Sequence, residues 1–438
     1  MTGAPWPASG RFSGRPTVQA EGARPILIAW EQGGNLGHLL RIKAVVELLR
    51  EQQREAILAV SHVLGNQFAE ALAGIPCAKV VVRCAAREGR HHPNAQAASF
   101  AGVLSGQGWT DEPWLRNSMQ AWVNLCQLTK PAAVVLDYAP VASLAACVLR
   151  IPALQISSGF DAPPPTRQGL GRFRSRTGEI SVAEAAEVAA VDAAIARVIA
   201  TLGHQGPAPF LREVLAYPRQ LLDCLPQTDP YGARENAVYA PFLSRSSTPA
   251  HASWPGEPSD PSRTRAFVYV REPIVAEQLL HALARRKVST LCFWPGYSGH
   301  LPFMKEHGIS VHAQPLDLND VFREASFVVS YGSVGIATRA VLAGIPQIVI
   351  PTDIEKGMVA QRLHEQGLGI CLKPRRASHG LDKALDQMLG TDVYRERCKA
   401  IQLQVQCAQA ERTFSKEIHA EMDRLTGQMW SIPMGASS

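Results

Sequence analysis

One short turn of this sequence has the composition of a phosphate site. Tyr331-Gly332-Ser333-Val334-Gly335 follows the apolar run Phe327–Ser330 and precedes an Ala/Val/Leu-rich segment that stops at Gly344. A strand, a glycine turn and a helix in this order direct free backbone N–H groups and the positive end of a helix dipole at one point. Such a turn favours a bound phosphate, although the same glycine spacing also occurs in purely structural turns.

A second turn carries a candidate proton acceptor. The apolar run Ile26–Trp30 is followed by a turn that contains Gly34, Asn35 and Gly37 and ends at His38. Asn35 is predicted to cap the helix that follows. The dipole of that helix disfavours an imidazolium ion, so a neutral His38 could accept a proton. A capping or surface histidine is the alternative interpretation.

Asp137 is the candidate partner of this histidine. It follows the apolar run Ala132–Leu136, at the strand end where the active sites of α/β proteins assemble. A carboxylate close to His38 would orient the imidazole, while the alternative role is a helix cap or a loop anchor. The first turn lacks the G-x-G-x-x-G fingerprint, so a nicotinamide enzyme is a poor interpretation.

The elements that must position these residues alternate between strands and helices in both halves of the chain. This alternation predicts an α/β protein with two doubly wound, Rossmann-like domains that face each other across a cleft. We expect a disordered tail over 1–25, a first domain over 26–243, a Pro/Ser-rich linker over 244–264 and a second domain over 265–392. A single helical segment is predicted within 393–438, and residues 84–114 are predicted to be a long polar loop.

Composition narrows the possible classes of protein. A chain of 438 residues is too long for one core, which agrees with two domains. The net charge of +6 permits an anionic substrate or peripheral contact with a membrane, but no clustered basic and aromatic residues suggest nucleic acid. No apolar run is long enough to span a membrane, and the first 25 residues lack the core of a secretory signal. With nine cysteines and no CxxC pair, the sequence indicates a cytoplasmic protein.

The segment from Gln314 to Gly369 resembles the nucleotide-sugar signature of the UDP-glycosyltransferases, a family with the GT-B fold. In that signature an H-G-G-x-G-T turn is followed by a helix, G-x-P, a strand with proline, and an acidic residue before glutamine. Three residues here differ from the pattern: Tyr331 replaces the histidine, Lys356 the glutamine and Val359 an asparagine. The turn at His38 is similar to the G-H element of the same family, with Arg41 in place of the commoner proline, and bacterial members share its WExGxxxGH opening.

The resemblance implies an inverting transfer of a sugar from UDP or dTDP to a hydroxyl group of a small-molecule or lipid acceptor. His38 would be the general base, with Asp137 holding its ring, and neither a cofactor nor a metal would be needed. Gly34, Asn35 and Gly37 would form a loop that faces the phosphate and the acceptor. The C-terminal helix would pack back on the first domain. The donor would be held by Gln314, Tyr331, Gly332, Ser333, Val334, Gly335, Glu355 and Lys356.

The sequence leaves two questions open: the role of Lys356, and the choice between a glycosyltransferase with a small-molecule acceptor and three other functions. A lysine in place of glutamine favours a donor with an anionic or acceptor-only group, unless Lys356 simply faces solvent. A sugar-nucleotide 2-epimerase would share the fold and the phosphate turn. A transferase with a lipid acceptor at the membrane surface is a close variant, and a non-catalytic nucleotide-sugar-binding protein would bind the donor without turning it over.

Overall fold

The computed structural model describes most of the chain. The described residues are 24–33, 36–60, 74–82, 97–166, 169, 170, 173, 180–204, 206–235, 237–241, 253–255, 263–269, 271–299, 303–373, 377–409 and 413–427. The predicted tail lies outside them except for its last two residues, as does most of the predicted linker.

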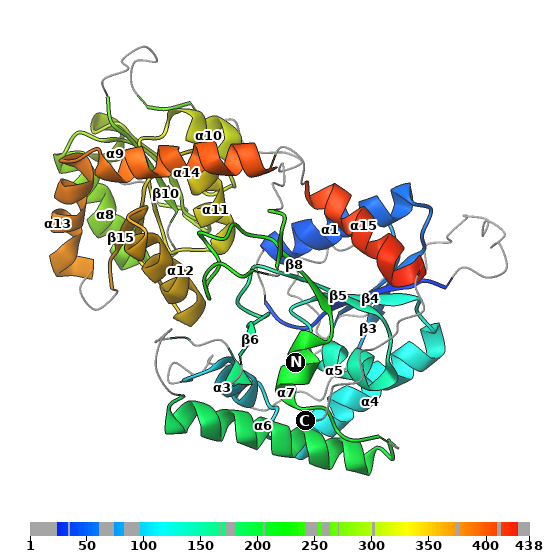
Figure 1. The fold of residues 1–438 in the computed structure, drawn as a ribbon. Coiled ribbons are helices and arrows are strands. Elements are labelled where there is room, and N and C mark those ends of the chain that lie inside the picture. Colours follow the sequence, from blue (N-terminus) through cyan, green and yellow to red (C-terminus); the bar gives the residue numbers. More distant parts are fainter. Residues whose placement is uncertain are drawn as a thin grey trace, which may run out of the picture.

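A parallel sheet of seven strands forms the centre of the first domain, in the order β3-β2-β1-β4-β5-β8-β9 (Figure 1). Strands β6 and β7 pair antiparallel in a separate two-stranded sheet. The strands are β1 (Ile26–Trp30), β2 (Ala56–Val60), β3 (Ala78–Val81), β4 (Ala133–Asp137), β5 (Ala153–Ser157), β6 (Pro165–Thr166), β7 (Gly169–Leu170), β8 (Arg219–Leu222) and β9 (Val238–Tyr239). The helices are α1 (Leu36–Glu51), α3 (Phe100–Gly106), α4 (Glu112–Thr129), α5 (Pro140–Leu149), α6 (Val182–Thr201) and α7 (Leu211–Ala216).

The side chains of strand β1 pack against helices on both faces of the sheet. Its five residues are all buried. Ile26, Ile28 and Trp30 pack with α1 on one face, whereas Leu27 and Ala29 pack with α3, α4 and α5 on the other. Continuous apolar runs of this kind are the signature of a parallel strand buried on both sides.

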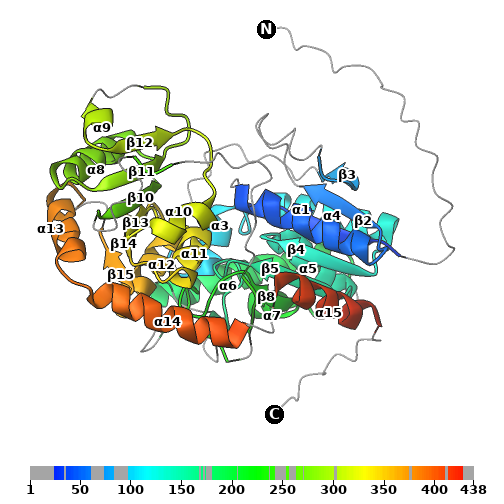
Figure 2. The same cartoon turned by 90° about the horizontal axis from the view of Figure 1, so that it is seen from above.

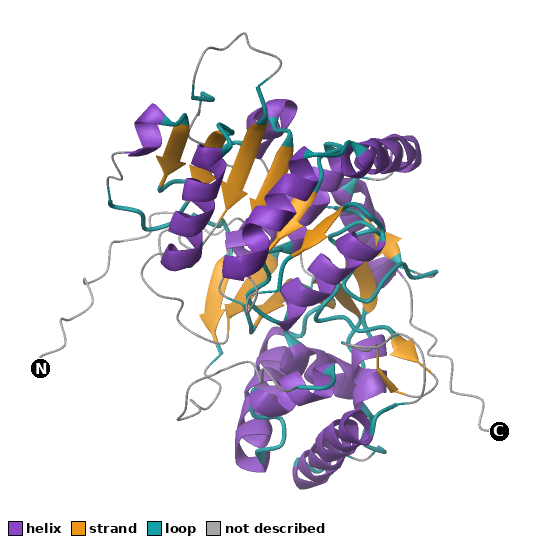
Figure 3. Cartoon of the chain, turned by 90° about the vertical axis from the view of Figure 1, so that its left-hand side faces the viewer, coloured by secondary structure: helices purple, strands orange, loops and turns teal. Residues whose placement is uncertain are grey.

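The second domain repeats this design with six parallel strands, in the order β12-β11-β10-β13-β14-β15. Helices flank both sheets (Figure 3). The strands are β10 (Arg265–Tyr269), β11 (Ser289–Phe293), β12 (Ile309–His312), β13 (Phe327–Ser330), β14 (Gln347–Val349) and β15 (Gly369–Cys371). The helices are α8 (Pro273–Arg285), α9 (Phe303–Glu306), α10 (Leu318–Glu324), α11 (Val334–Leu342), α12 (Ile354–Glu365) and α13 (Ala377–Leu389). The predicted class of two doubly wound α/β domains is therefore confirmed.

Each sheet has a point where the strand order reverses, and ligands of doubly wound proteins bind at such points. In the first sheet this point lies between β1 and β4, where Trp30 is in register with Asp137. In the second sheet it lies between β10 and β13, where Tyr269 is in register with Ser330. The two turns singled out in the sequence follow β1 and β13, so both start at these points.

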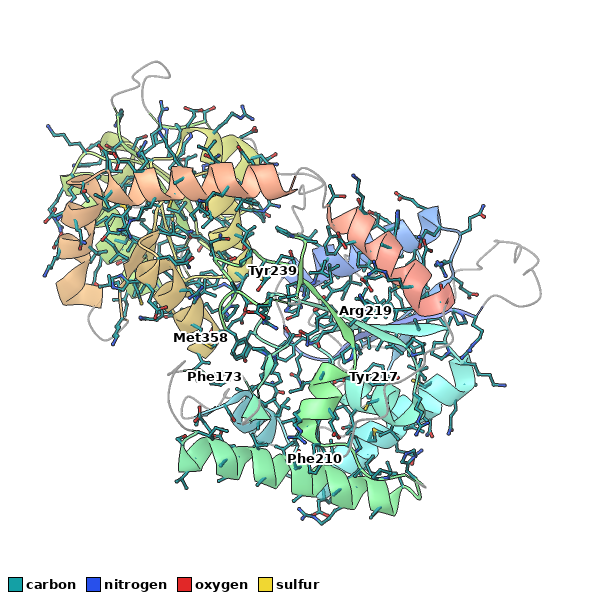
Figure 4. The ribbon with its side chains drawn as sticks, viewed as in Figure 1. Phe173, Phe210, Tyr217, Arg219, Tyr239 and Met358 are labelled. Carbon is teal, nitrogen blue, oxygen red and sulfur yellow. The ribbon has the colours of Figure 1, made fainter. Side chains whose placement is uncertain are left out.

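Helices α11 and α12 carry the contact between the domains. An apolar cluster joins Leu222, Cys224 and Leu225 of the first domain to residues of both helices. The hydroxyl oxygens of Thr228 and Thr338 lie 2.7 Å apart within this interface. Met358 of α12, labelled in Figure 4, belongs to the main core cluster of the first domain. The turn at β13 is thus held against the domain that carries His38.

Two predictions about the helices were wrong. The C-terminal segment forms two helices, α14 (Val393–Gln409) and α15 (Phe414–Gly427), where one was predicted. Helix α14 packs on α11 and α15 on α1 (Figure 2), and Arg219 of β8 donates to Glu421 of α15 at 3.0 Å. The described part of the predicted loop 84–114 contains α3 and the start of α4, whose N-termini are capped by Ser99 and Asp111.

None of the described helices combines the length and apolarity needed to cross a membrane.

Candidate functional site

His38 and Asp137 are in direct contact. Nδ1 of His38 lies 2.6 Å from Oδ1 of Asp137, and the Asp137 side chain is 3% exposed while that of His38 is 17% exposed. An ionised carboxylate can only accept hydrogen bonds, so Nδ1 of His38 is the donor in this contact. The predicted contact is confirmed, while the catalytic role of the pair stays a prediction.

Trp30 and Gly33 lie against the imidazole ring of His38. Trp30 stacks on the imidazole with ring centroids 5.9 Å apart. Gly33 has a φ of +83°, and a Cβ atom at this position would lie 2.4 Å from Nε2. Only glycine fits here, because a side chain would both strain the backbone and collide with the nitrogen that would accept a proton. Gly33 was not among the predicted site residues, although it is the first glycine of the WExGxxxGH opening and lies three residues after β1.

Arg41 makes a third member of this group. Its Nε donates to Oδ2 of Asp137 at 3.0 Å and its Nη2 to Oδ1 at 2.6 Å, while Nη1 donates to Asp223 Oδ2 at 2.9 Å. Burial alone would raise the pKa of Asp137, but Arg41 and His38 outweigh it and hold that pKa at about 2. A polar residue at this helical spacing would be expected on the solvent side of α1, but the Arg41 side chain is only 6% exposed.

Glu31 ties the His38 turn to the Asp137 turn. Its carboxylate accepts backbone hydrogen bonds from Val141 at 3.0 Å and Ala142 at 2.6 Å, in the first turn of α5. The backbone N–H of Gln32 donates to the carbonyl of Tyr138 at 3.0 Å. Burial raises the pKa of Glu31 to about 8 in spite of its two backbone donors. These bonds fix the loops after β1 and β4 to each other, and this aligns the histidine with the aspartate.

The turn after β13 has a rigid beginning. Tyr331 is 8% exposed and packs edge-on against Tyr269, with ring centroids 4.8 Å apart. Burial raises the pKa of Tyr331 above its ordinary value, so its hydroxyl stays protonated. Gly332 has a φ of +89°, and a Cβ there would lie 2.6 Å from a methyl group of Val349. A larger residue at 332 would displace the whole turn.

The N-terminus of α11 is open where a ligand would bind. Ser333 is the N-cap, but its side chain makes no capping hydrogen bond to the first turn. Val334 is buried, whereas Gly335 is exposed and no atom lies within 4 Å of a Cβ built on it. The first N–H groups of a helix have no partner within the helix, so this end can accept an anion.

Arg271 is a residue of this site that the sequence analysis missed. It lies two residues after β10, across the switch point from Tyr331, and its guanidinium is 5.3 Å from the centre of the Tyr331 ring. A cation beside an open helix N-terminus adds to the attraction for a diphosphate. The available signal was a basic residue directly after the first strand of the second domain.

Glu355 and Lys356 lie in the first turn of α12. The ammonium group of Lys356 is 3.0 Å from Asp353 and 3.1 Å from Glu355, and its side chain is 12% exposed. The interpretation of Lys356 as a solvent-facing residue is therefore wrong. Burial alone would lower its pKa, but the two carboxylates outweigh burial and raise it. Ser158 of the first domain donates to Glu355 at 3.4 Å, so this segment faces the first domain.

The remaining predicted residues are only partly placed. Gly37 is exposed in the first turn of α1, and Gln314 is exposed between β12 and α10. Gly34 and Asn35 lie outside the described residues. Across the ranges that the structure covers, no group of three or more His, Cys, Asp and Glu residues is arranged to hold a metal ion.

Comparison with known proteins agrees with this geometry. Residues 308–419 match the family model described as the C-terminal domain of erythromycin biosynthesis protein CIII-like proteins. The whole structure resembles the calicheamicin glycosyltransferase CalG4, with a TM-score of 0.65 and 16% identity over 93% of this chain and 99% of that one. The chain has the GT-B glycosyltransferase fold. The turn after β13 and Lys356 of this GT-B protein fall within the matched segment.

Two further proteins are similar to this chain, one in structure and one over a short stretch of sequence. The spinosyn rhamnosyltransferase SpnG, solved with thymidine diphosphate, is 15% identical with a TM-score of 0.60, over 90% of this chain and 99% of SpnG. Glycosyltransferase GtfC of Amycolatopsis orientalis is 38% identical over 58 residues. That stretch spans 13% of this chain and 14% of GtfC.

Proposed function

We propose that this protein transfers a sugar, with inversion, from a nucleoside diphosphate donor (UDP or dTDP) to a hydroxyl group of a small-molecule acceptor. The observation that carries the proposal is the 2.6 Å contact between His38 Nδ1 and Asp137 Oδ1 at the switch point of the first sheet. It supplies a neutral imidazole whose Nε2 can accept a proton. A diphosphate-accepting helix end begins at the switch point of the facing domain.

In the proposed reaction Nε2 of His38 removes the proton from the acceptor hydroxyl. The acceptor oxygen forms a bond to the anomeric carbon while the bond from that carbon to the diphosphate oxygen breaks, and a single displacement inverts the configuration. The proton stays on His38 and the electron pair leaves with the diphosphate. The N–H groups at Ser333–Gly335 and the guanidinium of Arg271 would stabilise the negative charge on this leaving group, without a metal.

The substrate classes follow from the groups beside each turn. The structures of SpnG with thymidine diphosphate and with its aglycone support a nucleotide donor and a small-molecule acceptor. In this chain a row of aromatic rings starts next to Asp137. Tyr138 packs on Phe100, Phe100 on Phe160 and Phe160 on Phe173, with centroids 5.5–6.4 Å apart. Rings at this position would favour an acceptor with an apolar or aromatic body.

Product analysis tests the proposal. The protein is incubated with UDP- and dTDP-hexoses, with and without a panel of phenolic and macrolactone acceptors, and in chelator or magnesium. A glycosylated acceptor with inverted configuration, formed equally in chelator, is expected. An epimerised donor formed without acceptor would identify a 2-epimerase, and binding without any product would identify a sensor. Activity that vanishes in chelator and returns with magnesium would contradict the metal-free part.

A further inference from the structure

The group formed by His38 and Asp137 does not end at two residues. Arg41 binds both oxygens of the Asp137 carboxylate, and its remaining Nη1 binds Asp223. Arg41 Nη2 also lies 3.1 Å from Nδ1 of His38. Arg41 is thus a buried cation in contact with the histidine, the aspartate that orients it and a second carboxylate.

A cation in this position has two opposing effects. Its planar fork fixes the Asp137 carboxylate more rigidly than one hydrogen bond could, and this favours a constant orientation of the imidazole. Its charge, however, offsets the negative charge of Asp137, which a protonated His38 would otherwise use for stabilisation. With Asp137 and Arg41 alone, the surroundings of His38 would be electrically neutral.

Asp223 changes this balance. Two carboxylates and one guanidinium leave one net negative charge in the hydrogen-bonded group, and a proton on His38 neutralises it. Asp223 is anchored directly after β8, where its backbone N–H donates to the carbonyl of Ser157 at 2.7 Å. Two more charged groups act from neighbouring elements. Asp161 is buried and interacts with both Asp137 and Arg41, while Arg339 of α11 interacts with Asp223.

We propose that Arg41 and Asp223 are positioning residues of the catalytic pair: Arg41 fixes Asp137, and Asp223 restores the negative charge that Arg41 removes. This rests on the proposed role of His38 as general base. It predicts that removing Arg41 and removing Asp223 change the basicity of His38 in opposite directions. A purely structural role would loosen the group in both variants and predicts no such opposition.

The test measures the titration of His38 without any substrate. Protein labelled with ¹⁵N-histidine is titrated by NMR, and the His38 signal is identified as the one absent from His38→Gln. Arg41→Met should raise the midpoint by about one pH unit or more, the usual effect of a charge at this distance. Asp223→Asn should lower it by a smaller amount. Arg41→Lys keeps the charge but loses the fork, so its midpoint should stay near that of the parent.

A second arginine of α1 supplies the control for the Arg41 variant. Arg50 lies on the same helix and is exposed, so Arg50→Met should leave the midpoint unchanged. If Arg41→Met does not fold, the direction of the Asp223→Asn shift decides alone. An upward or absent shift in Asp223→Asn would overturn the proposal, as would equal shifts in Arg41→Met and Arg50→Met. Because no donor or acceptor is present, this result is independent of whether the protein transfers sugar.

Turnover supplies the second readout. The probe is the release of nucleoside diphosphate from UDP-glucose or dTDP-glucose, with an accepted acceptor where one is found. Arg41→Lys should lower kcat by about tenfold or more, the size of a lost charge-assisted hydrogen bond, and leave the donor KM within about twofold. An unchanged kcat would overturn the positioning role of the fork. If the parent shows no turnover, the proposed function fails while the titration still tests the charge balance.

Discussion

Replacing Gly335 with aspartate isolates the role of the α11 N-terminus. No protein atom lies within 4 Å of a Cβ at this position, so the new side chain has room and the fold should be unaffected. Its carboxylate would lie in the space where the diphosphate is expected. One unit charge about 5 Å from another, at an effective dielectric constant of about 20, is repelled by about 3 kcal/mol. The affinity for dTDP or UDP should therefore fall by about two orders of magnitude.

The assay is isothermal titration calorimetry with dTDP and UDP, at low and high salt. Gly335→Asn has nearly the same shape without the charge and should bind within about tenfold of the parent. The difference between the two variants should shrink at high salt, because salt screens a partly exposed charge. Gly427→Asp makes the same change at the end of α15, where a Cβ likewise meets no neighbouring atom, and should leave nucleotide affinity unchanged. Equal affinities of Gly335→Asp and Gly335→Asn would refute the phosphate site.

Three further predictions concern other parts of the site. His38→Ala should lower the rate of sugar transfer by roughly two to four orders of magnitude while the affinity for the donor is retained. Asp137→Asn should lower the transfer rate less. A parental transfer rate in His38→Ala would mean that another residue is the base. Lys356→Gln should change the ranking of donors in a thermal-shift screen, because it frees Glu355 to accept from the sugar; an unchanged ranking would limit Lys356 to a structural ion pair. Burial raises the pKa of Glu31 in the folded protein from an ordinary 4.5 to about 8. The contribution of Glu31 to the free energy of unfolding is therefore fully present below about pH 4.5 and is lost as the pH rises through about 8. The stability of the parent relative to Glu31→Gln in urea should therefore fall between pH 5.5 and 8, and a constant difference would contradict the assignment.

The sequence predicted the strands and the two turns because each depends on neighbouring residues. Phe327–Val329 and Ile26–Trp30 are apolar without interruption, and this pattern is enough to identify buried parallel strands. The contact between His38 and Asp137 was predictable because the carboxyl ends of parallel strands meet at one edge. The role of Arg41 was not, because its partners lie 96 and 182 residues away and its local pattern suggests only a polar helix face.

The same reasoning explains why Lys356 was ambiguous. Its charge is compensated by Glu355, its neighbour in sequence, and by Asp353, which also caps α12 by accepting from the backbone N–H of residue 356 at 3.1 Å. The sequence contains all three residues but gives no information on burial, and burial decides whether a lysine near two carboxylates is a surface residue or a fixed ion pair. Its side chain is 12% exposed, which makes the ion pair part of the site.

The proposed reaction creates a positive charge in one domain and a negative charge in the other. His38 gains a proton on the first domain while the diphosphate gains an electron pair on the second, and each domain holds the opposite charge in advance. The first places Asp137 and Asp223 around Arg41, with one net negative charge beside the imidazole. The second places the open end of α11 and the guanidinium of Arg271 beside the leaving group. The contact between Thr228 and Thr338 joins the two domains, and charges that are already in place before a reaction need little reorganisation as it proceeds.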